Sequence, residues 1–240
     1  MTHIVIGYPS FEASMDTVAA MVDAGVDLVE MQIPFSEPIA DGPVILHANQ
    51  KALAAGATVE RCFEFAAEAV RRFDVPILFM SYYNILYRYG TEKFVERMAK
   101  LGLRGAIVPD LPPEEARDYL RAMNDHALDP IFIYSPNTPN DRLAFIAEHA
   151  KGFIYCVARK GVTGTATDFS VGMDAYLKRC RDATALPLAV GFGVKDKADV
   201  EFLVGKADVA VVGSQTIRVL DEEGVEAVGD FVRSLTNGVN

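Results

Sequence analysis

Val209-Ala210-Val211-Val212 is an apolar run of strand length, and Gly213 and Ser214 follow it at once. A run without polar side chains is typical of a strand that is covered on both faces, as in a parallel sheet between helices. Ala106-Ile107-Val108 shows the same pattern earlier in the chain. The sequence therefore predicts buried parallel strands that end in short turns.

Eight apolar runs of this kind alternate with segments of helical spacing along the 240 residues. The predicted strands are His3–Gly7, Asp27–Ile33, Val75–Ser81, Gly105–Pro109, Pro130–Ser135, Phe153–Ala158, Pro187–Gly191 and Asp208–Gly213. The predicted helices are Ser14–Ala24, Thr58–Arg72, Thr91–Lys100, Pro113–Asp125, Asn140–His149, Gly172–Arg181, Asp196–Gly205 and Thr216–Leu235. This alternation predicts an α/β fold, a single-domain (β/α)8 TIM barrel over residues 1–240. A doubly wound open sheet is the alternative, but the GxGxxG turn expected after its first strand is missing.

The composition excludes several classes of protein. Half of the residues are hydrophobic, which is enough for a large core, and the formal net charge is −10 without a Lys/Arg-rich run. Nucleic acid and anionic membrane surfaces are therefore not expected as main partners. Any phosphate group has to be held locally, by backbone amides.

Cysteine and histidine usage argues against disulfide and metal frameworks. Cys62, Cys156 and Cys180 stand far apart and form no CxxC pair, and the N-terminus enters a strand-like run without the pattern of a secretory leader. We therefore expect reduced thiols and a cytoplasmic location. The four histidines have no zinc-ligand spacing, so we expect neither a metal nor another cofactor.

The second predicted strand places a carboxyl group inside the barrel. Glu30 shares one face of this strand with Leu28 and Gln32, while the alternate residues are apolar and suit the helix side. A carboxylate among apolar side chains is costly unless it is paired or protonated. Two interpretations remain: Glu30 makes a structural hydrogen bond, or it is a general acid/base for proton transfer near neutral pH.

Polar and aromatic side chains also follow the third and fourth predicted strands. Tyr82, Tyr83 and Asn84 suit a pocket for a planar substrate, or a core position followed by a turn. Asp110, after the fourth predicted strand, is as typical of a loop cap as of a functional group. Asp41, in the loop after the second predicted strand and before Gly42 and Pro43, is when taken alone more often a helix cap than a catalyst.

Glycines follow the last three predicted strands. Gly164, Gly193 and the pair Gly213-Ser214 lie where phosphate usually binds in such barrels. Glycine lets backbone N–H groups approach an anion closely, and a helix N-terminus adds a favourable dipole. The segment 159–167 is rich in small residues and suits a mobile lid, with a solvated loop as the alternative.

Residue types that are absent from the predicted strands limit the possible reaction mechanisms. The predicted strand interiors contain no lysine for a Schiff base, and no histidine closes a strand. A barrel of this kind that breaks a carbon–carbon bond has to do so by proton transfer.

Several stretches together resemble the tryptophan synthase alpha chain family, and the resemblance covers nearly the whole chain. The stretches are Glu30–Pro43, Ser81–Asn84, Val108–Glu115, Gly152–Gly164, Val190–Gly193 and Val212–Ser214. The resemblance implies a carbon–carbon lyase of tryptophan biosynthesis, which cleaves indole-3-glycerol phosphate to indole and glyceraldehyde 3-phosphate. It also implies a pyridoxal-phosphate beta chain as partner, in an alpha2beta2 heterotetramer.

The resemblance assigns roles to individual residues. Glu30 is similar to the glutamate that shuttles protons to indole C3 and from the glycerol hydroxyl, and Asp41 to the aspartate that accepts the indole N–H. Tyr155 is similar to the tyrosine beside the glutamate. The implied substrate contacts are Tyr82 and Asn84 in the indole pocket, Thr163 of the lid, which helps to order Asp41, and Gly164, Phe192, Gly193, Gly213 and Ser214 around the phosphate.

Three features depart from the family pattern. Gln32 stands where the family usually has glycine, and adds a side chain on the inward face. Glu37 replaces the usual aspartate, in a loop that contacts the beta chain in the family. We do not expect the family's usual N-terminal helix, which closes the bottom of the barrel, because the first predicted strand begins near His3.

Two other functions remain open beside the lyase. The chain is then either a weakly catalytic activator or binding subunit of a beta chain, which a pocket crowded by Gln32 would favour, or a barrel lyase or isomerase for another phosphorylated substrate. The pair Glu30 and Asp41, together with the aromatic pocket, favours the lyase.

Overall fold

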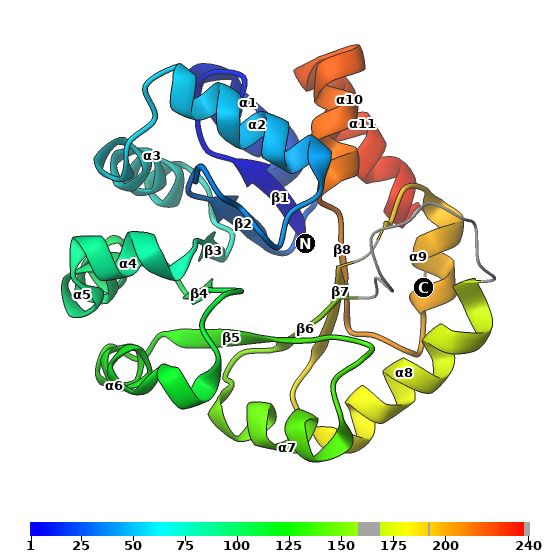
Figure 1. Ribbon diagram of the computed structural model, residues 1–240. Helices are drawn as coiled ribbons and strands as arrows, with labels where there is room; N and C mark the ends of the chain where they lie inside the picture. Colours follow the sequence, from blue (N-terminus) through cyan, green and yellow to red (C-terminus); the bar gives the residue numbers. More distant parts are fainter. Residues whose placement is uncertain (158–168, 192, 238–240) are drawn as a thin grey trace.

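Eight parallel strands form a barrel in the computed structural model, which describes residues 1–157, 169–191 and 193–237 (Figure 1). The strands are β1 (Thr2–Val5), β2 (Val29–Gln32), β3 (Ile77–Met80), β4 (Gly105–Ile107), β5 (Asp129–Tyr134), β6 (Ile154–Val157), β7 (Leu188–Gly191) and β8 (Val209–Val211). Each strand pairs in parallel with the next one in sequence, so the order in the sheet runs from β1 to β8. The predicted TIM barrel and its eight strands are confirmed.

The seam between β8 and β1 closes the barrel. Val212, directly after β8, forms a parallel bridge with Thr2. The N–H of His3 donates to the carbonyl of Val212 at 3.1 Å, and the N–H of Val212 donates to the carbonyl of Met1 at 3.0 Å. Since β1 is hydrogen-bonded on both sides, its inward side chains face β2 and the end of β8 together.

Helices surround the barrel, as Figure 1 shows. They are α1 (Phe11–Asp23), α2 (Pro43–Ala54), α3 (Val59–Arg72), α4 (Tyr83–Tyr89), α5 (Thr91–Leu101), α6 (Arg117–Asp125), α7 (Asn140–His149), α8 (Phe169–Ala183), α9 (Lys197–Leu203), α10 (Ser214–Glu223) and α11 (Val225–Thr236). Every predicted helical segment contains helix. In the described ranges, no helix combines the length and the apolar character needed to cross a membrane.

The helices differ from the prediction at a few places with clear causes. The segment predicted as one helix over Thr216–Leu235 is two, because Gly224 lies between α10 and α11 with φ +90°, a conformation that ends a helix. The first turn of the predicted helix Pro113–Asp125 is a separate 3₁₀ turn, Pro113–Glu115. Thr58 caps α3, since its side chain accepts the N–H of Arg61 at 3.2 Å.

Two helices, α2 and α4, were not predicted. The start of α2 carries Pro43 in its first turn, which is a favourable position for proline and a signal for a helix start. The α4 segment is rich in tyrosine, a residue of modest helix propensity, and its start is capped from another loop. The carboxylate of Asp110 accepts the N–H of Tyr83 at 2.8 Å, so Asp110 serves here as a cap.

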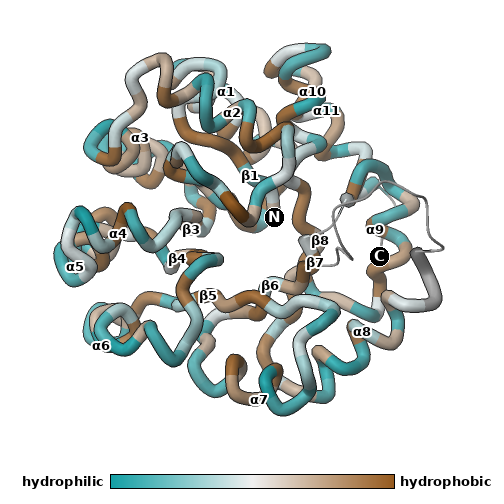
Figure 2. Tube along the Cα trace, in the orientation of Figure 1, coloured by the Kyte–Doolittle hydropathy of each residue, from teal (hydrophilic) through white to brown (hydrophobic). Residues whose placement is uncertain are grey.

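Apolar side chains pack on both sides of the strands. The outward residues, such as Ile4, Met31 and Phe79, form one core with the helices. The inward residues fill the barrel, and they include Met1, Leu78, Met80, Tyr82, Ile107, Ile131, Phe153, Ala189 and Val211. Figure 2 shows the result as hydrophobic strands inside helices with many hydrophilic stretches. The barrel interior is thus a packed apolar core, and any polar group within it needs a partner.

Candidate active site

Glu30 lies inside the barrel, on the face that the alternation predicted. Its neighbours Val29 and Met31 pack outward under the helices, while Glu30 itself is 3% exposed. Its Oε1 lies 3.1 Å from Nδ1 of His3, which is 4% exposed. The register of β1 and β2 pairs these two residues directly, so the contact follows from the strand ladder.

His3 was not among the predicted site residues. The signal that would have found it is positional: His3 and Glu30 both lie on the inward faces of the first two strands, and neighbouring parallel strands bring such faces together. A buried polar side chain on one strand can then serve as the partner of a buried polar side chain on the neighbouring strand.

Asp41 is held beside this pair by two donors. Nε2 of Gln32 donates to Oδ2 of Asp41 at 2.7 Å, and the hydroxyl of Tyr82 donates to the same oxygen at 3.0 Å. Burial raises the pKa of Asp41 and the charge of Glu30 adds to this, although the two hydrogen bonds and His3 act in the opposite direction. Asp41 does not cap α2, since the residue at the cap position is Gly42. The loop after β2 therefore carries a second carboxyl group to the barrel mouth.

Tyr82 is fully buried and links Asp41 to the barrel wall. Its ring stacks on Phe35 with 5.2 Å between centroids, and its hydroxyl accepts the N–H of Ala40 at 3.1 Å. Burial and the charge of Asp41 raise the pKa of the Tyr82 hydroxyl, so it stays a donor at neutral pH. Asn84, in contrast, is exposed in the first turn of α4, and the structure does not bring it to the carboxyl groups.

Tyr155 stands on β6 within reach of the charges of Glu30 and Asp41. Burial, followed by these two charges, raises the pKa of its hydroxyl well above the ordinary value, so the group stays protonated. The place of the ring depends on Gly191 of β7: a Cβ atom there would overlap the ring and hydroxyl of Tyr155. This explains the glycine at the end of β7 as a packing requirement.

The predicted phosphate residues lie only partly within the described ranges. Gly213 precedes α10, and Ser214 is its first residue. Within the described ranges the amides of Ser214 and Gln215 bind no carbonyl, while the amide of Thr216 donates to the carbonyl of Gly213 at 3.0 Å. Gly193 is exposed after β7, with φ +58°. Thr163, Gly164, Phe192 and the predicted lid over residues 159–167 lie outside the described residues.

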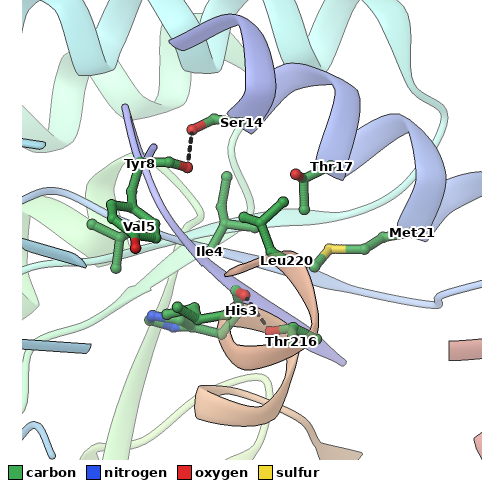
Figure 3. A pocket seen from close by; sticks show the side chains of 10 residues that line it. His3, Ile4, Val5, Tyr8, Ser14, Thr17, Met21, Thr216 and Leu220 are labelled. Atoms are coloured by element: carbon green, nitrogen blue, oxygen red, sulfur yellow. Dashed lines mark hydrogen bonds between the residues drawn. The ribbon is translucent and has the colours of Figure 1, made fainter. Parts of the chain in front are cut away.

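A small cavity adjoins the site behind His3. It lies between β1, α1 and α10, and its lining includes His3, Val5, Tyr8, Ser14 and Thr216 (Figure 3). Glu30 and Asp41 do not line it, so the cavity belongs to the packing between β1 and its helices.

The fold and the site together define a class of protein. A parallel eight-stranded barrel with a buried glutamate on an inward strand face, and an aspartate held beside it by the following loop, is the framework of a barrel enzyme. A sequence profile of the family described as "Tryptophan synthase alpha chain" matches residues 1–237. The chain belongs to the tryptophan synthase alpha chain family.

Individual relatives agree with this assignment. The chain is 68% identical over 235 residues to the tryptophan synthase alpha chain of Syntrophotalea carbinolica, covering 98% of this chain and 93% of that protein. It is 64% identical over 235 residues to that of Desulforapulum autotrophicum, with the same coverage of 98% and 93%.

Solved structures show the same fold. A tryptophan synthase chain from Mycobacterium tuberculosis, in an aminoacrylate-bound form, superposes with a TM-score of 0.90 at 31% identity, covering 100% of this chain and 92% of that one. A chain of the tryptophan synthase complex from Pyrococcus furiosus gives a TM-score of 0.89 at 29% identity, covering 98% of this chain and 96% of that one.

We expect Asp41→Asn to stabilise the fold at neutral pH. Because the folded protein raises the pKa of Asp41, the native state binds the proton of this group more tightly than the unfolded chain does. The ordinary pKa of an aspartate is 3.8. As the pH rises above this value, Asp41 loses its proton first in the unfolded chain, so the wild-type protein loses stability relative to the variant.

Urea unfolding of both proteins across this pH range measures the effect. The difference in free energy of unfolding should grow in favour of the variant as the pH rises, and then level off once Asp41 is ionised in both states. Asp16→Asn, an exposed substitution on α1, controls for the loss of one negative charge. A difference that does not change with pH would contradict the raised pKa of Asp41.

Proposed function

We propose that this chain cleaves indole-3-glycerol phosphate to indole and glyceraldehyde 3-phosphate, with Glu30 as the residue that transfers protons. The observation that carries the proposal is the buried Glu30 at the barrel mouth, beside an Asp41 that is already held in place, in a chain of the tryptophan synthase alpha family. Oε1 of Glu30 contacts His3, whereas Oε2 is buried without a partner among the described residues. Oε2 is the oxygen we assign to the substrate.

The proposed reaction is a retro-aldol cleavage with two proton transfers. Protonated Glu30 first gives its proton to C3 of the indole ring, which becomes positively charged. The resulting carboxylate then takes the proton of the hydroxyl on the carbon attached to C3. The O–H electrons form the aldehyde carbonyl, the bond from that carbon to C3 breaks, and its electron pair restores the aromatic ring. Glu30 ends protonated, as it began, so no other proton donor is consumed.

Asp41 stabilises the charged ring in this scheme. Gln32 and Tyr82 both donate to Oδ2, and we assign Oδ1 to the indole N–H. A carboxylate that is oriented before the charge develops stabilises the transition state without reorganisation. The contact of Thr163 with Asp41 stays a prediction from the family resemblance.

Tyr155 and Tyr82 complete the indole end of the site. Tyr155 supplies a neutral hydroxyl near both carboxyl groups, and we propose that it donates a hydrogen bond to Glu30 during the reaction. Tyr82 and Phe35 supply an aromatic wall of two stacked rings. Asn84 stays a predicted contact that the position of its side chain does not support.

Backbone amides hold the phosphate in this proposal. The start of α10 offers the N–H groups of Ser214 and Gln215, which bind no carbonyl of the described residues, and the positive end of a helix dipole. Such a site suits an acidic protein, because the attraction is local and does not depend on the net charge of −10. Gly193, Gly164 and Phe192 are the further phosphate contacts that we predict.

The proposed partner is a pyridoxal-phosphate beta chain, in an alpha2beta2 complex in the cytoplasm. A relative of this fold was solved as a tryptophan synthase complex, from Pyrococcus furiosus. The loop after β2 carries Glu37 and an apolar side chain, Ile39, that is 82% exposed. A large exposed apolar residue beside the active-site loop suits a contact with another subunit.

Incubation of the purified chain with indole-3-glycerol phosphate, with and without a beta chain, tests the activity. We expect indole to be released in at least one of the two conditions, measured by chromatography. If neither condition yields indole, the proposed lyase is wrong. A chain that releases no indole but speeds up the beta chain's own reaction would be the activator subunit instead.

Glu30→Gln should lower the rate of indole release by about 10³-fold, because it removes the group that gives and takes the proton. Binding of a non-cleavable indole-alkyl phosphate should persist, since the amide keeps the size of the side chain. Glu12→Gln, an exposed change on α1, is the matched control. A Glu30→Gln variant with wild-type turnover would remove Glu30 from the mechanism.

Gln32→Leu should lower kcat by about 10- to 100-fold, the range expected when one hydrogen bond to a charged group is lost. The substitution keeps most of the volume but removes the donor to Oδ2 of Asp41. Gln50→Leu, at an exposed position of α2, is the control. An unchanged kcat would mean that Tyr82 alone is sufficient to hold Asp41.

A further inference from the structure

The hydrogen bond between His3 and Glu30 has no counterpart in the predicted set of site residues. Nδ1 of His3 lies 3.1 Å from Oε1 of Glu30, and both side chains are buried in the barrel. The register of β1 and β2 sets this contact, so it does not depend on a loop.

The backbone of His3 is fixed from two sides. Its N–H donates to the carbonyl of Val212, and its carbonyl accepts the hydroxyl of Thr216 at 3.1 Å. Thr216 lies in the first turn of α10, next to the proposed phosphate site. Figure 3 shows the hydroxyl of Thr216 bonded to the His3 backbone, with the imidazole ring pointing away from it. The ring is therefore anchored on a rigid part of the barrel.

Three buried polar atoms beside this contact have no hydrogen-bond partner within the described ranges. They are Nε2 of His3, Oε2 of Glu30 and Oε1 of Gln32. A buried polar atom without a partner destabilises the folded state, because it has lost its hydrogen bonds to water. The side chain of Gln32 acts on His3 as a hydrogen-bonding neighbour, which leaves Oε2 of Glu30 as the atom that a polar ligand would complete, at the place of the proposed reacting atoms.

The charges around the ring favour its protonated form. Burial lowers the pKa of His3, but the charge and hydrogen bond of Glu30, with smaller effects of Asp41 and Gln32, raise it above its ordinary value of 6.5. The other titratable groups near this pair are the hydroxyl of Tyr155 on β6 and the amino group of Met1, which faces Glu30 and Asp27. Tyr8, across the small cavity, donates to Asp221.

We propose that His3 is a positioning residue for Glu30: its Nδ1–H donates to Oε1, which fixes the carboxyl group and directs Oε2 to the substrate. The protonated ring also stabilises the Glu30 carboxylate that exists between the two proton transfers. His3 itself neither gains nor loses a proton during turnover, so the balance of the retro-aldol reaction is unchanged. This inference rests on the proposed function of the same site.

His3→Phe and His3→Asn separate the two effects. Phenylalanine keeps the ring volume and removes the donor, whereas asparagine keeps an N–H donor near the place of Nδ1 but cannot be charged. We expect kcat for indole release to fall about 10- to 100-fold in His3→Phe, with KM within about threefold of the wild-type value. His3→Asn should retain more activity than His3→Phe.

The pH dependence provides a readout that a purely structural role would not change. In the wild type, kcat should fall as the pH rises through the pKa of His3, because the ring then loses its charge. This fall should be missing at that pH in both variants. His126→Asn, at the end of α6, should keep the wild-type profile. The proposal would be overturned if His3→Phe kept the wild-type kcat, or if kcat of His3→Asn fell at the same pH as kcat of the wild type.

A measurement without turnover separates this proposal from the lyase assignment. The titration of His3, followed by nuclear magnetic resonance of its ring, should show a lower pKa in Glu30→Gln than in the wild type, because the charge of Glu30 is gone. An unchanged pKa would disprove the pairing, whatever the activity. A lowered pKa in Glu30→Gln, together with no indole release by the wild-type chain with or without a beta chain, would leave the pairing intact and refute the lyase.

Discussion

The carboxyl group of Glu30 sits in an interior that is otherwise lined mainly by apolar side chains, and its contact with His3 is what makes that position tolerable. An ionised carboxylate in such surroundings is costly without a partner, and the cost of breaking a buried pair is larger than that of a surface pair. The partner comes from the neighbouring strand, in direct register. Exclusion of water around a carboxyl group also strengthens its electrostatic interactions, which makes it a more effective group for proton transfer.

The seam of the barrel connects this pair to the other end of the site. Val212 hydrogen-bonds the first strand on both sides of Thr2, and Thr216 of α10 bonds the carbonyl of His3. The turn that begins α10 therefore helps to close the barrel, and it also presents the amides of Ser214 and Gln215 at the strand ends. A shift of α10 would move both the backbone of His3, which partners Glu30, and the proposed phosphate amides, so the contacts we propose for the two ends of the substrate depend on one segment.

The sequence was sufficient for the parts of the fold that depend on local pattern. Apolar runs and their alternation predicted all eight strands and the inward face that carries Glu30, because strand periodicity repeats along each run. The helix α4 was missed because its cap, Asp110, lies in another loop. His3 and the bond from Gln32 to Asp41 were missed for a similar reason: each depends on a register or a loop path that brings distant residues together.

The side chain of Gln32 changes how the carboxylate of Asp41 is oriented. In the family resemblance, a lid threonine orders the aspartate, and Thr163 is the matching residue here. In this chain two donors that do not belong to the lid, Gln32 on β2 and Tyr82 directly after β3, already bind Oδ2 of Asp41. Asp41 is thus already oriented without the predicted lid contact. That contact can then add less to the order of Asp41, because a loop shifts a conformational equilibrium only by the difference between its affinities for the two conformations. The side chain that departs from the family's glycine thus acts on the aspartate through Oδ2, and leaves Oδ1 for the proposed contact with the indole N–H.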